Sequence, residues 1–596
     1  MKSLLPSLLG SVLLTSISCH AGDWLPPLPA WQGSSEALIQ TQDNPWLTPA
    51  ELNGLTDSPD YAATMAYLKA LVASSELLQL EQFGLSAQGR PLMLVKASKR
   101  LAKIANNPDR PLLLVQAGIH SGEIDGKDAG LMLLRDIVHG NQGHLLANAD
   151  LIFIPILSVD GHERRSAYNR MNQRGPLQQG WRTTAQNLNL NRDYAKADAP
   201  EMQALLGVLQ QYQPDLYIDV HVTDGEDYQY DITYGFNEPF AAISPNGASW
   251  LAQVYRPAVN AALTEAGHIP GPLVFGVDNK DFSKGIGGWT ASPRFSNGYG
   301  DVRHLPTVLV ENHSLKPYRQ RVLGTYVLLE RSLQVLNEQG KALIMARQAD
   351  LNARPKRMAL SFKASEQPDY IDFKGMSYEV RQSAISGESY VAWTGEPRLY
   401  QKLPIYWDKV VTRDIIIPKA YWLPPEQQQV MQRLKQHGIE LTLLTKATNI
   451  SVQQLSVSRY RFAEQPFESR LMLQDASFSR DNISRTVPAG WVKVSTDQAL
   501  GRLAVALLEP TAPDSFFSWG FFPGMFERTE YFEPYAIEPL IARMLQDQPA
   551  LQQQFEQALA EDEALRNSPR ERYNWFYRQM PFYDQQYLKY PVLIEP

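Results

Sequence analysis

The sequence predicts an α/β fold in which a largely parallel or mixed sheet is covered by helices on both faces. Between residues 80 and 340, continuous apolar runs alternate with amphipathic segments that have helical periodicity. Such alternation is typical of strands that are buried on both sides and joined by helices. The expected strands are residues 91–97, 110–118, 149–157, 214–222 and 306–314.

The N-terminal residues have the pattern of a signal peptide. A lysine and an apolar stretch precede small residues, and a cut after Ala21 would remove residues 1–21. This apolar stretch is too short for a good membrane span, and no other stretch is long and apolar enough, so we expect no transmembrane span. Cys19, the only cysteine, resembles a bacterial lipoprotein site, although Ser16 stands where such sites usually carry Leu. We therefore expect a periplasmic or secreted protein, with a lipid anchor at Cys19 as the alternative.

Length and composition indicate several domains. A chain of 596 residues is too long for one ordinary domain. After about residue 345, short alternating runs with polar turns indicate antiparallel β structure, and residues 549–580 are expected to be helical. The predicted order after the signal peptide is an extended lead-in (22–57), the α/β domain (58–345), a β-rich domain (346–450) and a mixed α/β region (451–596).

The charge balance excludes some classes of partner. The chain has 56 basic and 63 acidic residues, so its formal net charge of −7 is mild. A nucleic-acid-binding surface normally needs an excess of positive charge. We therefore expect no nucleic acid partner.

Three candidate metal ligands lie at the ends of predicted strands. His120 and Glu123 follow strand 110–118 on the turn into a predicted helix at 128–140, and His221 lies near the end of strand 214–222. In an open α/β sheet, sites assemble at the carboxyl ends of the strands. Each residue alone is more simply explained as structural, but two histidines and one carboxylate together form a catalytic zinc set. Calcium and magnesium prefer more oxygen ligands, so the expected cofactor is one Zn²⁺ per chain.

Further polar groups occur where an apolar or unremarkable residue would be expected. Glu311 interrupts the apolar strand 306–314, where a buried carboxylate is costly unless it has a partner or a task. It is either one half of a structural ion pair or a general base. Arg182, Asn191 and Arg192 lie in one polar segment, and arginine binds carboxylates in a bidentate manner. Taken alone, this segment could equally be a solvated loop.

Together, "HSGE" (120–123), "LNLNRDY" (188–194), "DVH" (219–221) and "VLVENH" (308–313) resemble the zinc carboxypeptidases of the carboxypeptidase A and N/E types. The resemblance covers about half of the chain, and the motifs are specific only as a set. It implies a twisted, mostly parallel eight-stranded sheet with helices on both faces, in agreement with the strand pattern. It also implies roles for individual residues. The zinc ligands would be His120, Glu123 and His221. Arg182 would polarise the scissile carbonyl, Asn191 and Arg192 would bind the terminal carboxylate of the substrate, and Glu311 would be the catalytic glutamate.

The sequence departs from the family pattern at two places. Where the family usually has an aspartate two residues before the Asn-Arg pair, this chain has Asn189. A neutral amide can still accept a hydrogen bond from the N–H of the first histidine ligand, but it lends that ligand less basicity than a carboxylate would. The mobile tyrosine of the family is also difficult to align, and Tyr299, in the Gly-rich segment 283–304, is our choice for a substrate-binding residue.

The resemblance implies a metallocarboxypeptidase that acts on peptides with a free C-terminus. Zinc and Glu311 would activate a water, and Arg182 would stabilise the oxyanion. One alternative is a zinc amidase or deacylase, or a cell-wall stem-peptide hydrolase, on the same scaffold. Another is a non-catalytic secreted binding protein, which would have no need of Glu311. The side-chain preference and the role of residues 346–596 cannot be read from the sequence.

Overall fold

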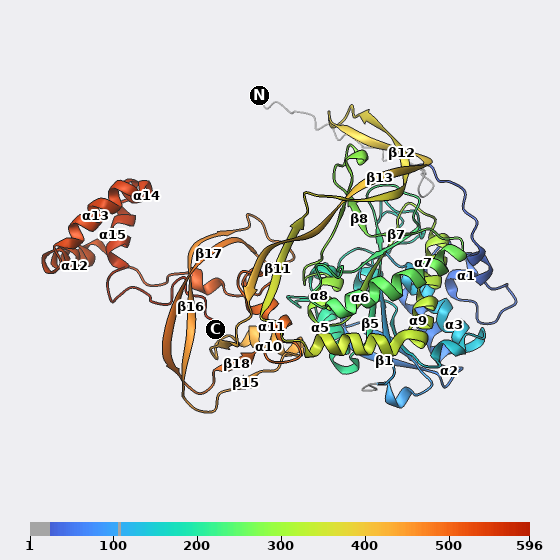
Figure 1. The fold of residues 1–596 in the computed structure, drawn as a ribbon, viewed down its shortest axis with the longest axis horizontal. Helices are drawn as coiled ribbons and strands as arrows, with labels where there is room; N and C mark the ends of the chain where they lie inside the picture. The colour runs from blue at the N-terminus through green and yellow to red at the C-terminus, as the bar shows by residue number, and fades with distance from the viewer. Residues whose placement is uncertain (1–23, 105–108) are drawn as a thin grey trace, which may run out of the picture. The chain divides into compact units, whose positions relative to one another are not determined.

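The computed structural model describes residues 24–104 and 109–596 (Figure 1). The predicted signal peptide and Cys19 lie outside these described residues. The chain divides into two compact units. The first runs to Ile416 and also includes Gln436–Gly438, and the second consists of Ile417–Lys435 and Ile439–Pro596. The domain boundaries expected near residues 345 and 450 remain predictions.

The first unit is built on an eight-stranded mixed sheet, as predicted. Four of its seven strand pairings are parallel and three are antiparallel. The parallel strands β4, β3, β5 and β10 are adjacent at the centre, so their carboxyl ends lie at one edge of the sheet. The strands, in spatial order, are β1 (Leu78–Leu85), β2 (Pro91–Ala97), β4 (Asp150–Ile154), β3 (Leu112–Ala117), β5 (Leu216–Thr223), β10 (Thr307–His313), β6 (Ile232–Gly235) and β7 (Pro270–Pro272).

Helices flank this sheet, and the longest is α9 (Tyr318–Asn352) (Figure 1). The expected helices at 58–75 and 128–140 are α2 (Tyr61–Ala73) and α3 (Asp125–His139). Gly140 follows α3 directly, at the position where the sequence predicts the helix to end. The other helices of this unit are α1 (Pro49–Leu52), α4 (Val159–His162), α5 (Pro200–Tyr212), α6 (Pro245–Trp250), α7 (Arg256–Glu265) and α8 (Ser296–Val302).

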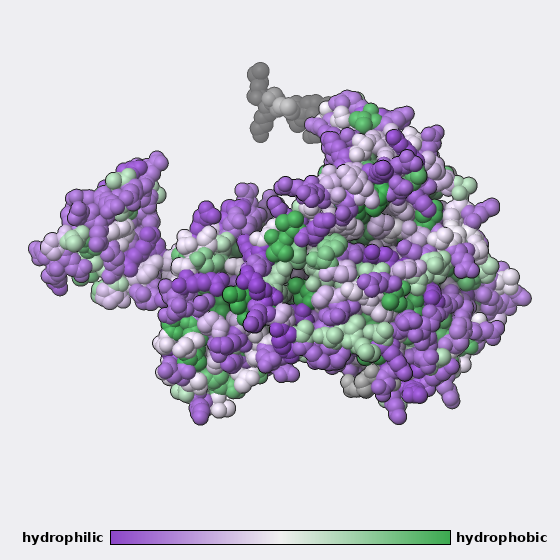
Figure 2. Space-filling model, viewed as in Figure 1, coloured by the Kyte–Doolittle hydropathy of each residue, from purple (hydrophilic) through white to green (hydrophobic). Residues whose placement is uncertain are grey.

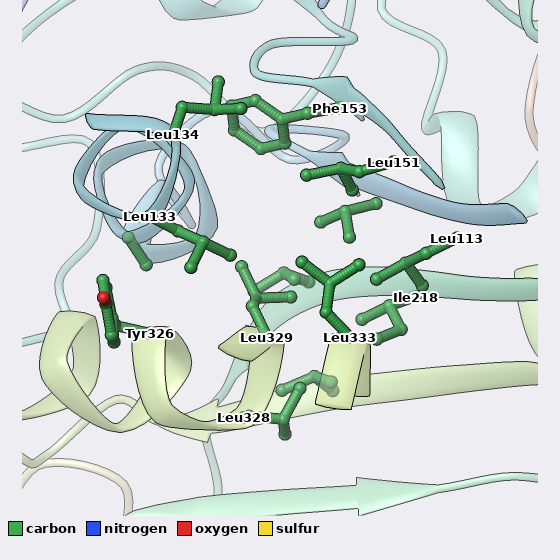
Figure 3. Packing of buried hydrophobic residues seen from close by; sticks show 14 of the residues in the cluster. Leu113, Leu133, Leu134, Leu151, Phe153, Ile218, Tyr326, Leu328, Leu329 and Leu333 are labelled. Atoms are coloured by element: carbon green, nitrogen blue, oxygen red, sulfur yellow. The ribbon is translucent and has the colours of Figure 1, made fainter. Parts of the chain in front are cut away.

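The main core lies between α3, α9 and one face of the sheet. Figure 3 shows Leu133 and Leu134 of α3 and Leu329 and Leu333 of α9 packed toward Ile218 of β5 and its neighbours on the sheet. Side chains alternate between the two faces of a strand, so the residues on either side of Ile218 point away from this core. The opposite face of β5 is therefore free to carry polar residues.

The segment after α9 forms antiparallel hairpins, as the alternating sequence predicts. Strands β12 and β13 pair along almost all of β12, and β11 pairs with the last part of β13. These strands belong to the first unit. The smaller sheet consists of β11 (Arg357–Ala364), β13 (Ser389–Ile416), β9 (Ile286–Gly288) and β8 (Val274–Gly276), with β12 (Asp369–Gln382) paired to β13.

The second unit combines a six-stranded sheet with helices. Its strands, in spatial order, are β15 (Thr442–Leu443), β18 (Val492–Ser495), β14 (Ala420–Leu423), β19 (Leu593–Glu595), β16 (Thr448–Phe462) and β17 (Leu473–Val487). The helical end expected at 549–580 is present. The helices are α10 (Gln428–Gln436), α11 (Gly501–Leu508), α12 (Pro534–Asp547), α13 (Ala550–Glu561), α14 (Glu563–Asn567) and α15 (Pro569–Tyr577).

The face of the protein in Figure 2 is mostly hydrophilic, with scattered hydrophobic residues. Single exposed apolar side chains are normal on a folded protein and indicate no particular partner. Across residues 24–104 and 109–596, no helix has the length and apolar character needed to cross a membrane.

Candidate metal centre and catalytic pocket

Three buried side chains converge at the carboxyl ends of β3 and β5. The Nδ1 atom of His120 lies 3.0 Å from Oε2 of Glu123, and the Nδ1 atom of His221 lies 3.1 Å from the same oxygen. The two Nδ1 atoms are 3.3 Å apart. One possible ligand atom from each of the three residues lies within 4.8 Å of the other two. The structure thus brings together the three residues predicted to bind zinc.

The turn after β3 explains why His120 and Glu123 face the same point. Gly118 has φ +64°, and a Cβ atom there would lie 3.1 Å from Ile124 and 3.2 Å from Ile156. A positive φ and close neighbours together favour glycine at this position. The chain then closes a tight turn in which the Glu123 amide donates to the carbonyl of His120, at 2.8 Å, and α3 begins two residues later.

The other nitrogen of each histidine is held by a hydrogen bond. Nε2 of His120 lies 2.7 Å from Oδ1 of Asn189, which also accepts from the Asn191 amide. Nε2 of His221 lies 2.8 Å from Oδ2 of Asp219. These partners hold Nε2 of each ring as a hydrogen-bond donor, so Nδ1 is the ring atom that faces the Glu123 carboxylate. Asn189 therefore occupies the place that the family's aspartate was expected to fill.

Electrostatics at this point favour a cation. When both Nδ1 atoms are unprotonated, three electron-pair donors lie within about 3.3 Å of one another, and they repel one another unless a positive charge, a proton or a metal ion, lies between them. Burial lowers the pKa of His120 to about 4, so this ring is neutral and able to bind a metal. Burial also disfavours charge on His221, but Asp219 and Glu123 outweigh it and raise the pKa of His221 well above its usual value. Two nitrogens and one carboxylate oxygen are the donor set that zinc prefers.

A buried polar network supports His221 from behind. Asp219 lies two residues before His221, so both point to the same face of β5. Its Oδ1 accepts from Gln116 at 3.0 Å, and Gln116 accepts from the hydroxyl of Tyr217 at 2.7 Å. Tyr194, at the end of "LNLNRDY", bonds to Tyr217 at 2.7 Å. This role of Asp219 was not predicted from the sequence, although its spacing from His221 on one strand is a signal for it.

Glu123 is also the centre of an ion-pair cluster. Its Oε1 lies 2.9 Å from Arg182 and 3.0 Å from Arg170, and its Oε2 accepts from the Val222 amide at 3.1 Å. Burial alone would raise the pKa of Glu123, but the contacts with His120, Arg170 and His221 hold it well below its usual value. No sequence motif marks Arg170, which lies in an irregular segment.

Glu311 lies on β10, directly beside His221 in the register with β5. Its side chain faces the pocket rather than the core, because the alternate residues Val308 and Val310 pack in the core under α9. Burial in the metal-free site raises the pKa of Glu311 to about 8, although His221 opposes that rise. The carboxyl group is therefore suited to both accepting and returning a proton near neutral pH.

These groups open into one pocket of about 480 Å³. Arg182, Asn191 and Arg192 line it together with His120, Glu123 and Glu311. The guanidinium of Arg192 lies 4.4 Å from the ring centroid of Phe295, and Asn191 accepts from the Ser296 amide at 3.1 Å. The remaining walls are mainly apolar. They are formed by Val222, Leu273, Phe275, Trp289, Phe295 and Leu309.

Tyr299 lies elsewhere. It is buried in α8, and its hydroxyl lies 2.8 Å from Nδ1 of His437. The guanidinium of Arg303 lies 3.3 Å from the same hydroxyl. Tyr299 is not among the residues that line the pocket, and within the described part of the chain no tyrosine is. The structure thus brings together seven of the eight predicted site residues but not Tyr299.

Part of this chain is similar to a known protein family. Residues 64–267 match the model of the zinc carboxypeptidase family. The matched segment includes the three candidate ligands as well as Arg182, Asn191 and Arg192, whereas Glu311 and Tyr299 lie beyond its end.

Curated proteins and solved structures give further matches. Carboxypeptidase 2 of Trichophyton rubrum is 21% identical over 505 residues, which is 78% of this chain and 85% of that protein. Carboxypeptidase 2 of Trichophyton tonsurans is 31% identical over 107 residues, which is 18% of this chain and 20% of that protein. A putative carboxypeptidase A from Shewanella denitrificans has 20% identity and a TM-score of 0.35, and the match covers 47% of this chain and 69% of that one.

Proposed function

We propose that this chain, whose residues 64–267 match the model of the zinc carboxypeptidase family, is a zinc-dependent metallocarboxypeptidase that removes the C-terminal amino acid from peptides. One observation carries the proposal. A single pocket is lined by His120 and Glu123 of the metal-binding triad, by the half-buried carboxylate of Glu311, and by two arginines with an asparagine, and His221 contacts Glu123 directly behind it. These are the groups that hydrolysis of a peptide bond next to a free carboxylate requires.

The proposed mechanism assigns each group a task. His120, Glu123 and His221 would hold zinc, which supplies a Lewis acid for the scissile carbonyl and the attacking water. Glu311 accepts a proton from that water and then donates it to the leaving nitrogen. Its place beside His221 puts the carboxylate next to the metal-binding atoms.

The arginines divide two tasks between them. Arg182 stabilises the negative charge that develops on the carbonyl oxygen. Asn191 and Arg192 bind the terminal carboxylate of the substrate, with Phe295 fixing the plane of the guanidinium from one side. Such an arrangement makes the enzyme an exopeptidase, because only a free C-terminus provides that carboxylate.

The pocket walls favour a large apolar residue at the C-terminus of the substrate. Phe275, Trp289 and Phe295 meet edge to face, with ring centroids 6.3 Å and 4.6 Å apart along the series. Asp224 is the one charged residue of the lining to which the mechanism gives no task, and it is exposed. Burial of an apolar side chain against these rings would stabilise the bound peptide by roughly 1.5–3 kcal/mol.

We also propose that the protein acts in the periplasm or outside the cell. The support is the signal-peptide pattern of residues 1–21, and a lipid anchor at Cys19 remains the alternative form of the same proposal.

Digestion of a mixed peptide library, read by mass spectrometry, tests the proposed activity. The expected result is stepwise loss of C-terminal residues, fastest for aromatic and large aliphatic ones. Addition of a chelator should abolish this cleavage. Internal cleavage, or release of N-acyl groups with intact C-termini, would contradict the proposal and favour an amidase or deacylase.

A further inference from the structure

Arg182 is paired with Glu123 in the substrate-free protein, although its proposed task is at the substrate. Its guanidinium lies 2.9 Å from Oε1 of Glu123, and its side chain is 43% exposed. An exposed arginine of this kind can move toward a peptide that enters the pocket. That movement would remove one partner from a buried carboxylate, which is unfavourable unless another group remains.

Arg170 is the group that remains. It lies 3.0 Å from the same Oε1 atom, and its side chain is only 9% exposed. Its Nε donates to Gln173 at 3.1 Å, and Gln173 in turn donates to the carbonyl of Gly122 at 2.8 Å. Arg170 is therefore tied to the same turn that carries Glu123.

The backbone of that turn fits closely against Arg170. A Cβ atom on Gly122 would lie 2.7 Å from both Cγ and Cδ of Arg170, a distance that real Cβ atoms essentially never show. The glycine thus allows the stem of Arg170 to pass directly over the ligand turn. Contacts on both sides of the side chain leave its guanidinium little freedom to move.

We propose that Arg170 is a positioning residue that holds Oε1 of Glu123 permanently, so that Glu123 binds the metal through Oε2 and Arg182 is free to move to the substrate. The two oxygens of Glu123 then have separate partners: Arg170 for Oε1, and the metal with the Val222 amide for Oε2. The contact of Arg170 with Glu123 concerns metal binding alone, whereas the movement of Arg182 to the substrate rests on the proposed function.

The test compares full-length Arg170→Gln and Arg170→Lys with the parent protein. Arg164→Gln is the matched control, because Arg164 belongs to the same segment and stacks on Trp181, 4.9 Å from its ring, without reaching Glu123. Zinc affinity is measured by competition with a chelator, and folding is checked by circular dichroism of the metal-free proteins.

We expect Arg170→Gln to weaken zinc binding by about 10- to 100-fold, in the range found for residues that support metal ligands. Arg170→Lys should show a smaller loss of zinc affinity, because lysine keeps the positive charge but lacks the planar guanidinium with its two N–H donors. Arg164→Gln should bind zinc as the parent does. In turnover, Arg170→Gln leaves Arg182 as the one arginine paired with Oε1 of Glu123 among the described contacts, so kcat should fall while KM stays nearly constant.

Equal zinc affinity in Arg170→Gln and Arg164→Gln would overturn the proposal. If Arg170→Gln does not fold, the comparison of Arg170→Lys with Arg164→Lys decides in the same way. A loss of zinc affinity in a protein that has no carboxypeptidase activity would support the metal-binding half and reject the proposed function. Failure of the proposed role of Arg170 and failure of the proposed carboxypeptidase activity therefore give different results.

Discussion

Glu311 and His221 are register partners on the adjacent parallel strands β10 and β5. Neighbouring strands lie about 4.8 Å apart, and paired residues on them point to the same face. The sheet itself therefore sets the separation between the proposed base and a proposed metal ligand. Neither residue depends on a flexible loop for its position.

This relationship predicts the effect of Glu311→Gln on turnover. The amide keeps the shape of the side chain but cannot accept a proton, so kcat should fall by about 10²–10⁴. Zinc content should stay at one equivalent, because Glu311 is not one of the proposed ligands. Steady-state kinetics and metal analysis of the same sample check both statements. Near-normal turnover would show that the carboxylate is structural.

The same substitution should change how stability depends on pH in the metal-free protein. Burial raises the pKa of Glu311 from 4.5 to about 8, so between these values the folded state holds a proton that the unfolded state has released. The free energy of unfolding therefore decreases as pH rises through this window. Glu311→Gln has no such proton and should gain stability relative to the parent between pH 5 and pH 8. Urea unfolding of both proteins at the two pH values measures this, and parallel curves would contradict it.

Metal binding should depend on His120. His120→Ala leaves two protein ligands, which seldom hold zinc tightly, so the dialysed protein should contain well below one equivalent. His144→Ala is the control, because His144 is exposed, bonds to the Asn141 carbonyl and is not one of the metal-binding triad. A full equivalent of zinc in His120→Ala would rule out the assigned ligand set.

The sequence predicts those site residues whose positions are set by strands and by the turns that follow them. His120, Glu123, His221 and Glu311 all lie at or just beyond strand ends, and the order of apolar runs is enough to locate these. Arg170 escapes prediction because an irregular segment brings it to Glu123, and no periodicity describes such a path. The contact of Asp219 with His221 could have been predicted, since residues two apart on a strand share a face.

Tyr299 shows a different limit. Its distance along the chain from Glu311 suggested a pocket residue, but α8 places it in the interior, against His437. Residues 436–438 belong to the first unit although the chain on both sides belongs to the second. A contact between positions so far apart in sequence cannot be inferred from local patterns.

The position of Tyr299 predicts a structural effect rather than a catalytic one. Tyr299→Phe removes the hydroxyl that bonds to His437 and leaves a buried ring nitrogen without that partner, at a cost of about 1–3 kcal/mol in the free energy of unfolding. Turnover at a temperature where both proteins are folded should change less than about threefold, because the residue does not line the pocket. A large fall in kcat with unchanged stability would instead show that Tyr299 reaches the substrate.

Arg192 distinguishes an exopeptidase from other zinc amide hydrolases. A guanidinium facing a carboxylate in a partly dry pocket makes a charge-assisted pair, and loss of one partner costs about 2–5 kcal/mol. Arg192→Ala should therefore lower kcat/KM for free-acid peptides by about 30-fold or more, by conversion of the lower figure. Peptides amidated at the C-terminus should already be poor substrates and should lose little further.

Arg182→Ala supplies the contrast for this experiment. Its proposed partner is the scissile carbonyl, which every substrate has, so free-acid and amidated peptides should slow by similar factors. The decisive quantity is the ratio of free-acid to amidated cleavage, measured on matched peptide pairs for the parent and both variants. If Arg192→Ala leaves that ratio unchanged, Arg192 does not bind a C-terminus. The pocket would then belong to an endo-acting or deacylating hydrolase, because the rest of the site requires only an amide bond.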